Sequence, residues 1–157
     1  MQIRKKDILS IGEFTKDELL YVLSIAKRFE EGSKDGKYSD LLKGKVLSTL
    51  FFEPSTRTRL SFESAMKRLG GSVIGFANAK TSSAAKGETV HDTAKMMEGY
   101  VDIIVVRHHI EGAPRVMAEA VTIPVINAGD GANQHPTQTF LDIYTILKSK
   151  GTLENLN

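Results

Sequence analysis

At residues 51–63 the chain reads Phe51-Phe52-Glu53-Pro54-Ser55-Thr56-Arg57-Thr58-Arg59-Leu60-Ser61-Phe62-Glu63. The apolar run 46–52 that leads into this stretch predicts a buried strand. A helix follows, because Phe62, Ala65, Met66 and Leu69 recur at helical spacing before Gly70-Gly71. A strand that passes directly into a helix is typical of the repeating unit of an α/β protein.

The same alternation extends to both sides of this stretch. A capping box, Thr15 to Glu18, begins a first helix. Further strands are predicted at 72–77, 103–106 and 125–127, and further helices at 88–99, at 114–120 and from Pro136 onward. The pattern therefore predicts a four-stranded parallel sheet with helices on both faces. Binding residues are expected at the carboxyl ends of its strands.

Length and composition place the chain among ordinary globular domains. Its 157 residues fit one domain, and 41% are apolar and 25% charged. We expect the domain to cover residues 1–150, and the polar segment 151–157 to begin a link to a further domain. The absence of cysteine excludes disulfides and thiolate metal sites.

Charge and hydropathy limit the classes of partner that the sequence indicates. With 21 Lys and Arg against 19 Asp and Glu, the net charge is +2, which does not indicate a nucleic-acid-binding protein. No run approaches the roughly 20 apolar residues of a membrane span. The basic start of the chain lacks the apolar core of a signal peptide, so we expect a cytoplasmic protein without a membrane partner.

The hydroxyls and guanidiniums after the first strand indicate an anion site. Backbone N–H groups at a helix start bind phosphate, hydroxyls add donors, and an arginine adds a bidentate fork. The glycine patterns of nucleotide-binding loops are absent, so a nucleotide is not implied. The alternative is an ordinary helix cap at Ser55 with surface arginines.

Two other strand ends carry candidate residues. Arg107 follows the strand at 103–106 and is expected to point into the same crevice. The adjacent His108 and His109 should point to opposite faces of an extended chain, and one metal ion rarely binds such a pair, so no metal is expected. His135 and Gln138 lie on the first turn of the last helix and can face one ligand; the alternative is a capping histidine with a solvated glutamine.

The loop Thr81-Ser82-Ser83-Ala84-Ala85-Lys86-Gly87-Glu88 consists mainly of small residues and has one lysine. On composition alone it is an ordinary surface loop.

Together these motifs resemble a known family. The stretch Phe52–Arg59 and His135-Pro136-Thr137-Gln138, with Arg107 between them, are similar to the amino-terminal half of the aspartate carbamoyltransferase catalytic chains. The resemblance extends from about Ile8 to Lys150. Ser-Thr-Arg-Thr-Arg is highly specific for the transcarbamylases, whereas Glu53-Pro54 and Ser61-Phe62-Glu63 resemble the aspartate enzymes more than the ornithine enzymes.

The resemblance implies the carbamoyl phosphate fold of aspartate and ornithine carbamoyltransferases and a role for each matched residue. Ser55, Thr56, Arg57 and Thr58 would hold the phosphate. Thr58, Arg107 and His135 would donate to the carbonyl oxygen, and Gln138 would accept from the carbamoyl amide. Ser82 and Lys86 would enter a neighbouring subunit's site in a homotrimer, and Glu88 would brace Arg57. Some members carry a second lysine where this chain has Ala85, which leaves Lys86 as the only lysine of the loop.

The activity implied is transfer of the carbamoyl group to the amine of L-aspartate, which gives N-carbamoyl-L-aspartate and phosphate in pyrimidine biosynthesis without cofactor or metal. L-Aspartate would require a second domain, and a regulatory subunit is a possible partner. We expect these 157 residues to bind carbamoyl phosphate, or phosphate, without turnover. Two alternatives remain: a transcarbamylase for another acceptor such as ornithine, and a non-catalytic module that holds carbamoyl phosphate.

Overall fold

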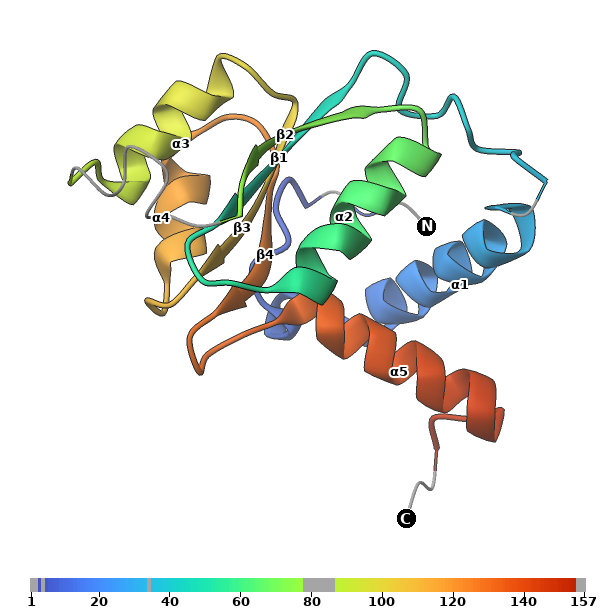
Figure 1. Cartoon of the computed structure of the whole chain (residues 1–157). Coiled ribbons are helices and arrows are strands. Elements are labelled where there is room, and N and C mark those ends of the chain that lie inside the picture. The colour runs from blue at the N-terminus through green and yellow to red at the C-terminus, as the bar shows by residue number, and fades with distance from the viewer. Residues whose placement is uncertain (1–2, 4, 34, 78–86, 155–157) are drawn as a thin grey trace.

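A computed structural model describes residues 3, 5–33, 35–77 and 87–154. The elements follow the predicted order, in which helices and strands alternate along the chain (Figure 1). They are the 3-10 turn η1 (Ile11–Glu13), α1 (Lys16–Ser33), β1 (Val46–Phe51), α2 (Thr56–Arg68), β2 (Ser72–Phe76), α3 (Val90–Glu98), β3 (Ile103–His108), α4 (Ala113–Ala120), β4 (Val125–Asp130) and α5 (Pro136–Lys150).

The four strands form one parallel sheet in the order β2-β1-β3-β4, which confirms the predicted sheet. From the central strand β1 the chain proceeds first to β2 on one side and then to β3 on the other. A parallel sheet binds ligands where its strand order reverses in this way, outside the carboxyl ends of the two strands. Here Phe51, the last residue of β1, is in register with Arg107 of β3.

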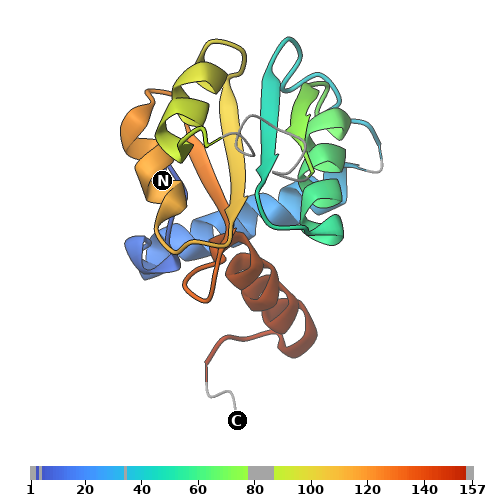
Figure 2. The same cartoon turned by 60° about the vertical axis from the view of Figure 1, so that its left-hand side comes forward.

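Helices cover both faces of the sheet (Figures 1 and 2). The helices α3 and α4 pack on one face, where Met97 and Met117 belong to one apolar cluster with Leu50 and Ile104 of the sheet. On the opposite face Met66 and Phe62 of α2 pack against Leu47, Phe51 and Val105. Val22 of α1 and Phe140 of α5 lie near Ile103 and Ile126 on this second face. Alternate residues of each central strand are thus buried on opposite sides.

The strands β3 and β4 extend beyond their predicted ends. The sequence predicts these strands at 103–106 and 125–127, but backbone pairing continues through Arg107 and His108 in β3 and through Asp130 in β4. Hydropathy could not indicate this, because His108 and Asp130 are buried although they are polar. Arg107 therefore lies within a strand rather than after it. The other predicted boundaries differ by one or two residues; β1 ends at Phe51, and α3 begins at Val90 with Thr89 as its cap.

The amino-terminal segment is attached to the far edge of the sheet. Ile8 bridges Ile126 in parallel, and Lys6 Nζ donates to the carbonyls of Ala118 and Val121 at the end of α4, at 2.9 and 2.8 Å. The predicted capping box is present, because the Thr15 amide donates to Glu18 and the Glu18 amide donates to the Thr15 hydroxyl. Within the described ranges, no helix has the length and apolar character needed to cross a membrane.

Candidate functional site

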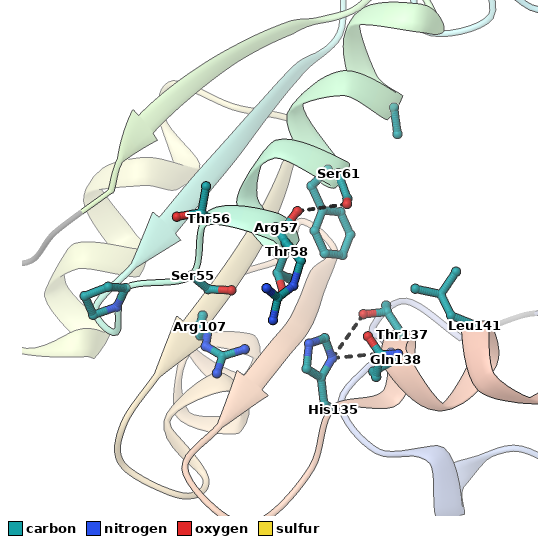
Figure 3. A pocket seen from close by; sticks show the side chains of 13 residues that line it. Ser55, Thr56, Arg57, Thr58, Ser61, Arg107, His135, Thr137, Gln138 and Leu141 are labelled. Carbon is teal, nitrogen blue, oxygen red and sulfur yellow. Dashed lines mark hydrogen bonds between the residues drawn. The ribbon is translucent and has the colours of Figure 1, made fainter.

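A pocket of about 940 Å³ opens at the carboxyl ends of the central strands, between the first turns of α2 and α5 (Figure 3). Both helices direct their amino-terminal ends toward it, so the positive ends of two helix dipoles meet there. The described residues that line it are Pro54, Ser55, Thr56, Arg57, Thr58, Ser61, Phe62, Ala65, Arg107, His135, Thr137, Gln138 and Leu141.

The first turn of α2 presents donors without acceptors. Ser55 occupies the cap position in an extended conformation, but its side chain makes no capping hydrogen bond. The first amides of a helix have no intrahelical acceptor, and here no capping hydroxyl replaces it. The first turn of α2 also has no acidic residue. This helix start can therefore bind an anion through backbone amides and the hydroxyls of Ser55 and Thr58.

The two arginines of the Ser-Thr-Arg-Thr-Arg motif lie in different surroundings. Arg57 lines the pocket, whereas Arg59 donates to Glu63 at 2.8 Å on the side of α2 that faces β2. Residues two positions apart on a helix point about 200° apart, so both guanidiniums cannot reach one ligand. Thr49 of β1 also donates to Glu63, at 3.3 Å, which ties α2 to the sheet.

Arg107 extends from β3 into the pocket between two acceptors. Its Nη1 donates to the Ala128 carbonyl at 3.3 Å, and its Nη2 lies 3.5 Å from a carboxylate oxygen of Glu53. Among the described residues its buried Nε has no partner. Gly129 makes room for this side chain, because a Cβ there would lie 3.0 Å from Nη1 and 3.5 Å from the His135 ring.

His135 is held as a neutral donor. Its Nδ1 accepts from the Gln138 amide at 3.3 Å, and the Thr137 hydroxyl lies at the same distance. An Nδ1 that accepts places the proton of a neutral ring on Nε2, which is then able to donate to a ligand. Burial, and secondly the charge of Arg107, lower the pKa of His135 below its ordinary value of 6.5.

Gln138 lies at the exposed rim of the pocket, in the first turn of α5. Its Nε2 donates to Asp142 at 2.9 Å. This bond orients the amide so that the oxygen Oε1 is the group left to accept from a ligand.

The pocket brings together all the predicted site residues on the described elements: Ser55, Thr56, Arg57, Thr58, Arg107, His135 and Gln138. Ser82 and Lys86 lie outside the described residues. Glu88 is described, and no hydrogen bond or ion pair within the described chain joins it to Arg57. Sequence reasoning did not place Glu53 in the site. The available signal was an acidic residue two positions after the end of β1, the strand that pairs with the Arg107 strand.

The two histidines after Arg107 do not point apart as expected. Their rings stack with centroids 4.5 Å apart, because His109 lies beyond the end of β3, where the strand alternation no longer applies. His108 is buried against Phe52, and its Nδ1 accepts from the Ile110 amide at 2.9 Å. In the part of the chain that the structure describes, no three His, Asp or Glu side chains are grouped so as to hold a metal ion.

Comparison with known proteins agrees with this geometry. Residues 6–148 match the family model of the aspartate/ornithine carbamoyltransferase carbamoyl-P binding domain, and the chain belongs to this family.

Similar proteins are aspartate carbamoyltransferase catalytic subunits. That of Thermococcus kodakarensis is 56% identical over 156 residues, which cover 99% of this chain and 50% of the relative. That of Parabacteroides distasonis is 54% identical over 154 residues, or 98% and 49%. The chain thus spans about half the length of the curated relatives it matches.

Solved structures give the same result. The catalytic subunit of M. jannaschii aspartate transcarbamoylase superposes with a TM-score of 0.88 at 53% identity, covering 94% of this chain and 48% of that one. Aspartate transcarbamoylase from Trypanosoma cruzi in complex with carbamoyl phosphate and aspartate gives 0.87 at 38% identity, with the same coverage.

Proposed function

We propose that the pocket binds carbamoyl phosphate and that the chain is the carbamoyl phosphate half of an aspartate carbamoyltransferase. The observation that carries the proposal is the meeting of Arg57, Arg107 and the neutral His135 at one helix start with uncapped amides. Such a set of donors suits a ligand with a phosphate dianion at one end and a carbonyl oxygen at the other.

The phosphate lies at the start of α2 in this proposal. Ser55, Thr56 and Thr58 supply amides and hydroxyls, and Arg57 supplies a fork for two phosphate oxygens. These are charge-assisted bonds to a dianion, and the open first turn of α2 stabilises the same charge.

The carbamoyl group lies toward β3 and α5. Thr58, Arg107 and His135 Nε2 donate to its carbonyl oxygen, and Gln138 Oε1 accepts from its amide. Glu53 and the Ala128 carbonyl hold the Arg107 guanidinium at this position. The ligand is thus oriented at both ends.

In the reaction the amine of L-aspartate attacks the carbamoyl carbon, a C–N bond forms, and the C–O bond to phosphate breaks. Negative charge develops on the carbonyl oxygen and on the leaving phosphate, and the departing phosphate takes the amine proton. The enzyme contributes position and charge stabilisation rather than a covalent nucleophile. Loss of one such oxyanion donor costs about 2.7–4 kcal/mol of barrier.

Aspartate is favoured over ornithine as the acceptor because the similar catalytic subunits and structures are those of aspartate enzymes. Its binding site belongs to a second domain, to which residues 151–157 lead from the domain at 1–150. The product enters pyrimidine biosynthesis in the cytoplasm.

The assembly proposed is a homotrimer with sites shared between subunits. Ser82 and Lys86 of one subunit complete the neighbour's site. In the assembled trimer Glu88 braces Arg57. A regulatory subunit is a further possible partner of this assembly. The support is the family resemblance of the 81–88 loop.

Calorimetric titration of the chain with carbamoyl phosphate and with inorganic phosphate tests the proposal. Carbamoyl phosphate is expected to bind more tightly than phosphate, because it alone engages Arg107, His135 and Gln138. If neither anion binds, the proposal is refuted. Assays of any longer gene product with aspartate and with ornithine test the acceptor.

A further inference from the structure

Asp130 is a deeply buried carboxylate that lies outside the pocket lining. It is the last residue of β4 and is 2% exposed. Four donors surround its two oxygens: the Asn127 side chain and the Gln134 amide on Oδ1, at 2.9 Å each, and the Gly112 amide and the Asn133 side chain on Oδ2, at 2.8 and 3.0 Å. These groups come from β4, from the start of α4 and from the loop before α5.

The first structure that this network holds is a bulge in β4. Val106 pairs with Asn127 and His108 with Asp130, so Ala128 and Gly129 together face the single residue Arg107. The Asn127 side chain donates to Asp130 and accepts from the Gly129 amide at 2.8 Å. The bulge places the Ala128 carbonyl and the bare Gly129 against the guanidinium of Arg107.

The second structure is the loop that carries His135. Asp130 and Gln134 form a closed bridge, because the Asp130 amide donates to the Gln134 carbonyl at 3.1 Å and the Gln134 amide donates to the Asp130 carboxylate. His135 is the next residue and caps α5. The direction in which α5 leaves the sheet, and hence the place of the imidazole, follows from this bridge.

We propose that Asp130 is a positioning residue, which through the bulge and the bridge brings Arg107 and His135 to one ligand oxygen. The inference rests on the proposed function. An ionised carboxylate suits the role because it accepts four bonds and donates none. An asparagine has the same shape, but its NH₂ group would face donors.

The test compares Asp130→Asn with two other variants by calorimetric titration. Each is titrated with carbamoyl phosphate and with inorganic phosphate, and its thermal unfolding is recorded. Asp102→Asn is the matched control, because Asp102 also accepts from a side chain and from an amide, those of Lys45 and Val46, at the opposite end of the sheet. Asn133→Ala removes one of the four donors and serves where Asp130→Asn fails to fold.

For Asp130→Asn, phosphate affinity is expected to change less than about twofold, whereas carbamoyl phosphate affinity falls about tenfold or more. Asn133→Ala should also weaken carbamoyl phosphate binding more than phosphate binding, so that the two affinities become more similar. Asp102→Asn should lower the unfolding temperature and leave the ratio of the carbamoyl phosphate and phosphate affinities unchanged.

If the Asp130 and Asn133 variants lose stability but keep the wild-type ratio of the two affinities, Asp130 is only structural and the inference is wrong. Failure of the wild-type chain to bind either anion is a different result, which refutes the proposed function itself.

Discussion

Arg57 and Arg59 are two residues apart in the sequence and have different tasks in the structure. Arg57 lines the pocket and Arg59 pairs with Glu63. The consequence for binding is testable with Arg57→Ala. Ligand at 100 times its dissociation constant should stabilise the wild-type chain by about 2.7 kcal/mol. For a domain of this size that is roughly 5–10 °C in unfolding temperature.

Arg57→Ala is expected to abolish this protection by phosphate or carbamoyl phosphate while the unliganded protein unfolds as before. Thermal unfolding with and without ligand measures it. Arg68→Ala, at the other end of α2, removes the same charge outside the pocket and should keep the protection. Equal protection of both variants would contradict the phosphate site.

His135 should be neutral at pH 7. Its pKa lies below 6.5, so the unfolded chain takes up the proton first as the pH falls. The contribution of His135 to stability is therefore fully present above about pH 6.5 and is lost as the pH falls through the folded pKa. A residue-resolved NMR titration of the ligand-free chain checks the charge of His135, with exposed His91 as internal reference. Thermal unfolding at several pH values checks its contribution to stability. An imidazolium at position 135 at pH 7 would disagree with these predictions.

At the scale of elements, the ends of β3 and β4 determine the geometry of the pocket more than their apolar centres do. Gly129 has a φ of +116°, and a Cβ there would meet the Arg107 guanidinium. Gly129→Ala is expected to destabilise the chain by about 1–3 kcal/mol, because an L side chain is strained at this φ. It should also weaken carbamoyl phosphate binding, because Arg107 must move.

Thermal unfolding and titration of Gly129→Ala measure the two effects. The control is Gly99→Ala, since Gly99 has a φ of −74° and the nearest atom to its added Cβ lies at 3.5 Å. A Gly129→Ala variant that binds and unfolds like the control would show that the bulge does not set the Arg107 position.

At the scale of the whole molecule, the charge in the pocket limits what the chain does alone. Arg57 and Arg107 are the cations among its described lining residues, and both are assigned to carbamoyl phosphate. Aspartate, with two carboxylates, needs further cations. Without an oriented amine the reaction loses about 7–11 kcal/mol of barrier reduction.

We therefore expect the 157 residues to bind carbamoyl phosphate and to form carbamoyl aspartate at a negligible rate. Product formation from radiolabelled carbamoyl phosphate measures this. A rate near that of a complete aspartate carbamoyltransferase would mean that aspartate is captured by residues outside this pocket.

Shared sites in a trimer predict complementation. An Arg57→Ala chain and a Lys86→Ala chain should each bind carbamoyl phosphate poorly. In an equal mixture, about a quarter of the interfaces of closed trimers combine the intact Arg57 of one chain with the intact Lys86 of its neighbour. Titration of the mixture should recover that share of sites. Full-strength binding by a monomeric wild-type chain would contradict shared sites.

Local patterns in the sequence are sufficient to predict the order of helices and strands and most of the pocket residues. Hydropathy has period 2 in strands and 3.6 in helices, and Thr15 and Pro136 mark helix starts. Residues just after parallel strands gather at one edge of the sheet. The stretches Ser55 to Thr58 and His135 to Gln138 can therefore be assigned to one site from their positions along the chain.

How those residues are used depends on tertiary contacts. The pairing of β1 with β3 brings Glu53 to Arg107, and the bulge in β4 lets the guanidinium approach His135. Burial of Asp130 among four donors depends on three segments meeting at one point. Local patterns do not encode the pairing of Arg107 with Glu53 or of Asp130 with the Gly112 amide, because these partners are distant in sequence. Burial of such polar groups costs free energy unless folding supplies their hydrogen-bond partners, and only the tertiary structure brings these partners together.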